Sequence, residues 1–187
     1  MNPVTEERVF DVALTCDDYR RMPDGERCEL LEGDLQETGA PTQRHQRIYR
    51  RVEVALNEHV EKHGPGEVFH APIDVVLSHT TVLQPDILFI SRARSRIVGR
   101  EAITAAPDLI VEILSPSSAE RDRITKRRLY SRYGVREYWI VDSEARSIEI
   151  CVHDGRELVT HGVWPEATES ESSLLQGFKL DLAELFA

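Results

Sequence analysis

The chain has 187 residues, 41% of them hydrophobic, which is enough for one sizeable core and predicts a single domain. A formal net charge of −10 argues against non-specific adhesion of the whole surface to nucleic acid, and three cysteines far apart in sequence argue against a disulfide framework or a thiolate zinc site. No stretch approaches the roughly 18 apolar residues of a membrane-spanning helix, and the first residues lack an apolar signal segment, so we expect a cytoplasmic protein with no membrane partner.

The first predicted elements are a short helix and a hairpin. Residues 15–22, "TCDDYRRM", are typical of a helix with a threonine cap, ended by Pro23. The sequence "CELLEGDLQE" at 28–37 predicts two strands that turn at Gly33 and Asp34.

A long helix and a pair of strands are predicted next. From 42 to 63 the apolar residues recur at helical spacing, and Gly64 is a natural stop. The β-rich runs 67–77 and 82–90 enclose a polar turn and predict an antiparallel pair. An Arg-rich connection then leads to a short helix predicted near 101–105.

The second half begins with an apolar strand predicted over 108–115. A capping box of Ser117 and Glu120 then starts a helix that is expected to run to about Tyr133. The pattern over 136–163 predicts a meander of hairpins.

The order of these elements predicts the fold class. From residue 42 it is helix, three strands, helix and strand, which indicates an α/β (α+β) domain with a mixed central sheet flanked by helices. We expect one domain over 1–187 with a core at about 42–142, an extra N-terminal hairpin and a C-terminal β-meander. The tail is predicted to pack three apolar side chains on the core, Phe178, Leu182 and Phe186.

Two acidic side chains lie within apolar strands. Glu112 is flanked by apolar residues, and Asp86 follows Pro85 in the run that precedes it. A buried ionised carboxylate is costly unless a partner holds it. Because side chains alternate along a strand, two neighbouring strands would bring these carboxylates together on one face.

A pair of such carboxylates indicates a metal site. Two facing carboxylates repel unless a cation lies between them. Oxygen ligands suit Mg²⁺ or Mn²⁺, so the pattern predicts one of these ions as cofactor. The ion would activate a water molecule and neutralise charge on a phosphodiester, which predicts phosphoryl chemistry.

The helix after Glu112 offers a catalytic lysine. Lys126 is one of only three lysines in the chain, and it lies four residues after Asp122 on one helical face. It is predicted to orient the attacking water or to stabilise the transition state. By spacing alone, an ordinary surface ion pair of Asp122 and Lys126 fits equally well.

The basic residues are concentrated in one segment. Between Arg92 and Arg136 there are 11 Lys/Arg and 5 Asp/Glu, whereas the rest of the chain is strongly acidic. This segment is either a solvated basic helix face or a phosphate-binding surface near the acids. The predicted contacts to nucleic acid are Arg92, Arg94, Arg96, Arg121, Arg123 and Arg127.

These motifs carry a resemblance. The stretches "HAPIDVVLSHTTVLQPDILFI" and "APDLIVEILSPSSAERDRITKRRLYSRYGVREYWIVD" resemble the Uma2 family of the PD-(D/E)XK nuclease superfamily, and the likeness extends over most of the chain. The resemblance implies a restriction endonuclease-like αβββαβ core. It also implies that Asp86, of the Pro-Asp pair, and Glu112, of the Glu-x-Lys position, bind the metal.

The chain departs from the superfamily pattern at one position. Two residues after Glu112 stands Leu114 in place of lysine, and Lys126 matches a lysine moved to the following helix. The resemblance further implies roles for Glu32, as a metal ligand or behind the ligands, and for His45, in substrate contact or proton transfer. Asp74 is interpreted as an acid hydrogen-bonded in the core or behind the ligands.

The leading hypothesis is a Mg²⁺-dependent endonuclease that hydrolyses DNA, with Asp86, Glu112 and Lys126 as catalytic residues. The alternative is a nuclease-fold module that binds nucleic acid or a protein partner without cutting, which Leu114 and the net charge favour. A hydrolase of small phosphodiesters is a third possibility. A homodimer would allow both strands of DNA to be cut, although no residue requires it.

Overall fold

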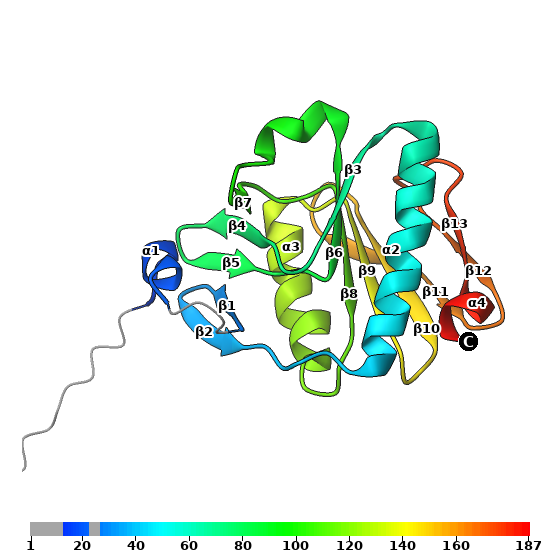
Figure 1. Ribbon diagram of the computed structural model, residues 1–187, viewed down its shortest axis with the longest axis horizontal. Helices are drawn as coiled ribbons and strands as arrows, with labels where there is room; N and C mark the ends of the chain where they lie inside the picture. Colours follow the sequence, from blue (N-terminus) through cyan, green and yellow to red (C-terminus); the bar gives the residue numbers. More distant parts are fainter. Residues whose placement is uncertain (1–12, 23–26) are drawn as a thin grey trace, which may run out of the picture.

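A six-stranded mixed sheet forms the centre of the structure, a computed structural model that describes residues 13–22 and 27–187 (Figure 1). From one edge to the other its strands are β11 (Leu158–Pro165), β10 (Ser147–His153), β9 (Glu137–Asp142), β8 (Leu109–Ile113), β6 (Ile87–Ser91) and β3 (Gly66–His70). The central strands β8 and β9 run parallel, and the other neighbouring pairs are antiparallel. The meander predicted over 136–163 is confirmed.

Helices cover both faces of this sheet (Figure 1). The long helix α2 (Gln43–His63) packs on one face, while η2 (Arg121–Lys126) and α3 (Arg127–Tyr133) pack on the other. Alternation along β8 divides its side chains between two cores, so that Val111 packs with α2 and Ile110 packs with α3. The expected sheet with helices on either side is therefore confirmed.

The helix α2 follows directly from its sequence. The Thr42 side chain accepts a hydrogen bond from the backbone N–H of His45 at 3.2 Å, which caps the first turn. Gly64 ends the helix with a left-handed φ of 65°, a conformation that glycine adopts without strain. Its apolar stripe is buried, namely Ile48, Val52, Leu56 and Val60.

A smaller sheet lies beside the first (Figure 1). Its strands, in order, are β2 (Asp34–Glu37), β1 (Cys28–Leu31), β5 (Thr81–Leu83), β4 (Asp74–Ser78) and β7 (Ala102–Ile103). The short helix α1 (Cys16–Arg20) packs on this sheet, and Thr15 caps it reciprocally with Asp18. The predicted threonine cap is confirmed, whereas Pro23 lies outside the described residues.

The remaining elements complete the sheet's surroundings. They are the 3₁₀ helix η1 (Arg92–Ile97), the two-stranded ribbon of β12 (Glu169–Glu171) and β13 (Lys179–Asp181), and the helix α4 (Leu182–Phe186). The three apolar side chains predicted to anchor the C-terminal segment are buried in the core that α2 covers. Among the helices of the described residues, none has the length and apolar character to cross a bilayer.

The predicted pairing of the runs 67–77 and 82–90 is only partly right. Each run is divided into two strands, so that β4 pairs with β5 in the small sheet and β3 pairs with β6 in the large one. The breaks fall at Pro72 and Pro85, because proline has no N–H to give to a ladder. Asp86 therefore lies just before β6, at the crossing between the sheets, and not within a strand.

Two further local predictions are wrong. The segment 101–105 contains the strand β7 and no helix, because Ile103 is fully buried and pairs with β4. The hairpin of β1 and β2 turns at Glu32 and Gly33, whose φ values are 53° and 95°, and Asp34 already belongs to the second strand. Two successive positive φ values are typical of a type I′ turn.

The helix after β8 is confirmed, but its start differs from the prediction. Ser115 and Ser118 cap it reciprocally, each hydroxyl accepting from the backbone N–H of the other residue at 3.2 Å. The expected pair of Ser117 and Glu120 makes no such box. The first part of the helix, η2, is a π-helical segment, a form that recurs at functional sites.

Candidate active site

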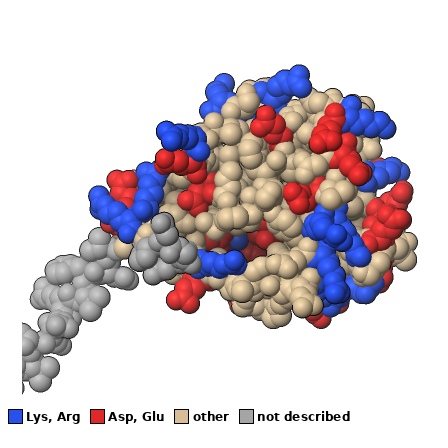
Figure 2. All heavy atoms as spheres, viewed as in Figure 1, with Lys and Arg blue, Asp and Glu red and all other residues tan. Residues whose placement is uncertain are grey.

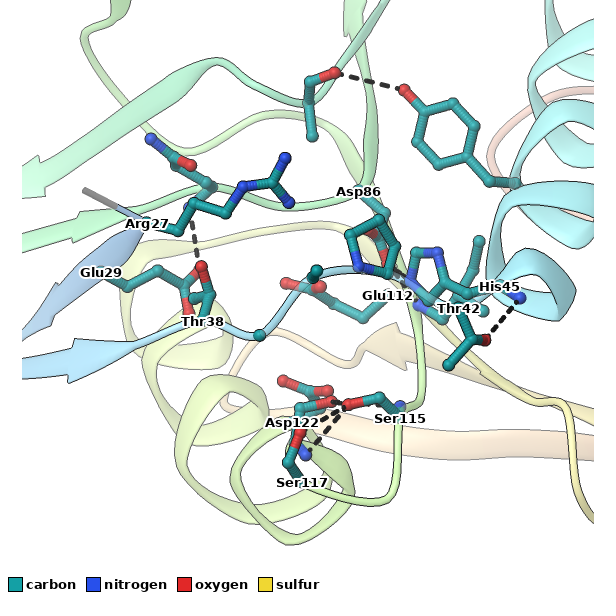
Figure 3. Close-up of a pocket in the computed structure, with 18 of the residues that line it drawn as sticks. Arg27, Glu29, Thr38, Thr42, His45, Asp86, Glu112, Ser115, Ser117 and Asp122 are labelled. Carbon is teal, nitrogen blue, oxygen red and sulfur yellow. Dashed lines mark hydrogen bonds and ion pairs between the residues drawn. The ribbon is translucent and has the colours of Figure 1, made fainter. Parts of the chain in front are cut away.

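A cavity of about 900 Å³ opens where β8 ends. Its walls come from the segment 38–42 that leads into α2, the first turns of α2, the loop after β8 and the start of η2 (Figure 3). Acidic side chains are visible at the bottom of a hollow on this face of the molecule (Figure 2). Asp86, Glu112 and Lys126, which the sequence predicted as one site, all line this cavity.

Glu112 is held by two donors. Alternation along β8 turns its side chain toward η2 and α3, where Nζ of Lys126 donates to Oε1 at 2.9 Å. The hydroxyl of Tyr130 donates to the same oxygen at 2.6 Å. Glu112 is only 4% exposed, so these charge-assisted bonds offset part of the cost of its burial.

Lys126 lies among three carboxylates. Besides Glu112, its Nζ is 2.9 Å from Oε1 of Glu29 and 3.4 Å from Oδ1 of Asp122. Asp122 and Lys126 are both buried, while Ile124 on the same π-helical segment is 62% exposed. An ordinary surface ion pair is therefore the wrong interpretation of Asp122 and Lys126.

The protonation of this cluster follows from its burial and its excess of acids. Burial raises the pKa of Glu112 well above its ordinary value, although the ammonium of Lys126 opposes the shift. Burial also raises the pKa of Asp122. Burial alone would lower the pKa of Lys126, but the surrounding carboxylates outweigh it and hold that pKa well above its ordinary value. The lysine stays charged, and the three carboxylates outnumber this single cation.

Asp86 is fixed from two sides. Its Oδ2 accepts the backbone N–H of Ile113 at 2.7 Å and lies 3.2 Å from Nε2 of His45 (Figure 3). Burial lowers the pKa of His45, but the hydrogen bond and charge of Asp86 outweigh it and raise that pKa above its ordinary value. The structure thus places His45, expected near the site, directly against one of the two predicted metal ligands.

The donor set suits a hard divalent cation. Oε2 of Glu29 and Oδ1 of Asp122 are buried and have no hydrogen-bond partner in the described part of the chain, and the Lys126 ammonium 3.4 Å from Oδ1 of Asp122 is an ion-pair contact only. The bonds to Glu112 both use Oε1, and those to Asp86 both use Oδ2. Each acid thus keeps an oxygen outside the protein's own hydrogen bonds, as oxygen coordination of Mg²⁺ requires.

The same acids are not arranged around a single point. Within residues 13–22 and 27–187, no three His, Cys, Asp or Glu side chains form a group that could hold a metal ion as they stand. The amine of Lys126 lies within 2.9 Å of both Glu29 and Glu112. A metal here would thus have to share these carboxylates with the lysine or displace it.

Glu32 does not line the cavity. It lies in the turn between β1 and β2, where it pairs with Arg128 and with Nη1 of Arg132 at 2.6 Å. The acid that β1 contributes is Glu29, which was not among the site residues predicted from the sequence. The signal was present, because Glu29 lies within the apolar run "CELL" much as Glu112 lies within its own strand.

A hydrogen-bond chain behind the cavity supports Glu29. The backbone N–H of Gln84 donates to Oε1 of Glu29 at 2.9 Å. The side-chain amide of Gln84 donates to Oδ1 of Asp74 at 2.9 Å, and the hydroxyl of Tyr19 donates to the same oxygen at 3.1 Å. Asp74, expected to be hydrogen-bonded in the core or behind the ligands, contacts the site through Gln84.

Three of the arginines that were predicted to contact phosphates form ion pairs within the protein. Arg94 lies 3.3 Å from Asp108, and Arg123 and Arg127 lie 3.2 and 3.0 Å from Glu149. These guanidinium groups pair with carboxylates at the start of β8 and on β10, and they are not part of the cavity wall.

The other three predicted contacts differ in position. Arg121 lines the cavity, and its Nη1 is 3.5 Å from the carbonyl oxygen of Glu37. Arg92 and Arg96 lie on η1 and are not among the residues of the cavity wall. Their role in DNA contact stays a prediction.

The mixed sheet carries buried acids at the end of its central strand, a lysine on the helix that follows and another helix on its opposite face. Together these features define a restriction endonuclease-like domain. The family model described as "Putative restriction endonuclease" matches residues 16–183, and the chain belongs to this family, Uma2. The predicted family and fold class are confirmed.

One solved structure shares this fold over nearly its whole length. It is a protein of Anabaena variabilis described as a "putative nuclease belonging to DUF820", with a TM-score of 0.75 and 20% sequence identity. The similarity covers 92% of this chain and 97% of that one. No curated protein matches the sequence.

Proposed function

We propose that the protein is a metal-dependent nuclease that hydrolyses phosphodiester bonds of DNA. The observation that carries the proposal is the buried cluster of Glu29, Glu112, Asp122 and Lys126 beside Asp86, in the wall of one cavity. The Uma2 family and the similarity to a described nuclease support the reaction class.

Asp86 and Glu112 are the proposed ligands of Mg²⁺ or Mn²⁺, with Glu29 as a third. When bound, such an ion lowers the pKa of a water ligand and neutralises charge on the phosphodiester. The free oxygens of these side chains and the excess of carboxylates over cations in the cluster support this assignment. The assignment would be wrong if divalent metal ions had no effect on the activity or the stability of the protein.

The protein's own groups position the reaction. Lys126, held by Glu112, is proposed to place its ammonium against the phosphoryl oxygens, where negative charge develops. His45 and the Ile113 amide fix the orientation of Asp86. Tyr130 donates to the same oxygen of Glu112 as Lys126 and thereby limits the rotamers of Glu112.

The substrate and the setting belong to the same proposal. Arg27 and Arg121 line the cavity and are proposed to contact DNA phosphates there. A cytoplasmic location fits a DNA substrate. A homodimer stays a prediction that sedimentation of the pure protein would decide.

A second candidate function is a module that binds nucleic acid without cutting it. One observation favours it: the ammonium of Lys126 already occupies the space between Glu29 and Glu112. Leu114, which packs in the core at the usual lysine position, points the same way. In this case the fold would bind DNA equally well with and without divalent ions.

The test is cleavage of plasmid and of labelled oligonucleotides with Mg²⁺, Mn²⁺ or EDTA. We expect metal-dependent cutting by the wild type and loss of at least about a hundredfold in Asp86→Asn and Glu112→Gln, because each removes a ligand charge. Glu32→Gln, outside the cavity, is the matched control and should cut normally. Cleavage that persists in both ligand variants would refute the site, and binding without cleavage would favour the second candidate.

A further inference from the structure

The first half of α2 carries two arginines that have no partner among the described residues. Of its four arginines, Arg44 pairs with Glu144 at 3.1 Å, and Arg51 donates to the carbonyl of Leu185 at 2.9 Å. Arg47 and Arg50 are exposed, and neither forms a hydrogen bond or ion pair with any described residue. Because they are three positions apart, their guanidinium groups lie on one face of the helix.

These two arginines border a depression that meets the cavity. The depression has a volume of about 330 Å³ and is lined by Gln43, Gln46, Arg47 and Arg50. Gln46 also lines the cavity, so the two hollows share this residue as part of their walls. Basic side chains gather over this part of α2, on the same face as the hollow with the acids (Figure 2). Guanidinium and amide N–H groups together are the usual donors to phosphate oxygens.

The cavity is suited to an unpaired strand. Its charged groups lie deep, since the side chains of Glu112 and Lys126 are each 5% exposed. A volume of about 900 Å³ is that of a small-molecule pocket, which a base pair with both its strands exceeds. Tyr49 and His70 lie in its wall with ring centroids 6.0 Å apart, and aromatic rings beside a basic groove are typical of single-strand binding.

We infer that the α2 face formed by Gln43, Gln46, Arg47 and Arg50 binds the phosphates of a single DNA strand whose next nucleotides enter the cavity. The identity of the strand as substrate rests on the proposed nuclease function. None of the residues of this α2 face is among the six arginines that the sequence predicted to contact nucleic acid. It supplies positive charge beside a cavity whose own cluster is rich in carboxylates, which would otherwise repel the backbone.

The test is the binding of a fluorescein-labelled 12-nucleotide strand and of its duplex, followed by anisotropy in EDTA over a range of salt. We expect tighter binding of the single strand. In the variant Arg47→Gln/Arg50→Gln, the negative slope of log K against log salt for that strand should become shallower by about 1.4, because two phosphate contacts are lost. Both side chains are exposed, so the variant is expected to fold, and its circular dichroism checks this.

The matched control is Arg100→Gln/Arg156→Gln, which removes two exposed charges far from α2 in sequence and should leave the slope unchanged. An unchanged slope in Arg47→Gln/Arg50→Gln, or an equal change in the control, would overturn the inference, as would tighter binding of the duplex. Cleavage is measured separately, in Mg²⁺. A wild type that binds in the expected way but never cuts would refute the nuclease and leave the α2 surface standing.

Discussion

Lys126 is the side chain whose loss should destabilise the protein most, because it is the cation nearest to three buried carboxylates. We expect Lys126→Met to lower the free energy of unfolding by about 3–5 kcal/mol, the usual cost of leaving a buried charge unpaired. Lys179→Met is the control, since Lys179 is 56% exposed and forms a surface ion pair with Glu169. It should cost less than about 0.5 kcal/mol.

Urea unfolding at pH 7 measures both variants. The double variant Glu112→Gln/Lys126→Met should recover part of the loss, since it removes one of the stranded charges together with the lysine. If Lys126→Met were as mild as Lys179→Met, the cluster would not hold the ammonium that the distances indicate.

Glu29 and Glu32, three residues apart on the first hairpin, offer a matched pair. Glu29→Gln removes the carboxylate proposed as the third ligand, so we expect a loss of at least about 10–100-fold in metal-dependent cleavage, the range for groups that only orient metal ligands. Glu32→Gln removes only the exposed pairs with Arg128 and Arg132 and should leave cleavage unchanged. The reverse result would restore Glu32 as the functional acid of this hairpin.

At the scale of elements, Asp108 joins four of them at the start of β8. Its Oδ2 accepts the backbone N–H of Ser91 at 2.8 Å, where β6 meets η1, and its carbonyl accepts the N–H of Glu137 on β9. Burial would raise the pKa of Asp108, but the Ser91 hydrogen bond and Arg94 outweigh it and lower that pKa below its ordinary value. The side chain is fully buried.

The lowered pKa fixes the sign of a pH effect. A carboxyl group with a depressed folded-state pKa stabilises the protein above its unfolded pKa of about 3.9, and that contribution is lost as the pH falls through the folded value. We expect Asp108→Asn to cost about 1–3 kcal/mol at pH 7 and progressively less toward pH 3. Thermal unfolding from pH 7 to 3 measures the difference, and a constant difference would contradict this account.

The elements also show where sequence reasoning succeeds. The helix α2 was predicted within a residue at each end, because its cap, its apolar period and Gly64 all act locally. The runs around Pro72 and Pro85 were predicted as single strands, since nothing local reveals that one chain serves two sheets. The strand β7 was missed for a related reason, because only its partner β4 makes two residues into a strand.

At the scale of the whole molecule, the basic and the acidic residues differ in where they lie. Many residues of the predicted basic segment form ion pairs within the protein, such as Arg123 and Arg127 with Glu149. The net charge of −10 includes the carboxylates of the buried acidic cluster. An ion that binds this cluster in the folded protein alone would stabilise it by about 2.7 kcal/mol at a hundred times its Kd.

We therefore expect Mn²⁺ or Mg²⁺ to raise the Tm of the whole chain and EDTA to reverse the rise. Differential scanning fluorimetry measures it without relying on cleavage. The rise should disappear in Asp86→Asn and in Glu112→Gln and persist in Glu32→Gln. An equal rise in all three variants would place the ion elsewhere on the protein.

The sequence by itself indicated the family, the central helices and strands, and the candidate acids Asp86 and Glu112, because an acid in an apolar run is costly to bury whether or not it lies within a strand. It also indicated Lys126 through its helix spacing from Asp122. Only the tertiary structure decided that Glu29 joins these residues while Glu32 does not. It also showed which arginines lack a partner among the described residues, since whether a guanidinium pairs with a carboxylate depends on contacts between elements far apart in the chain.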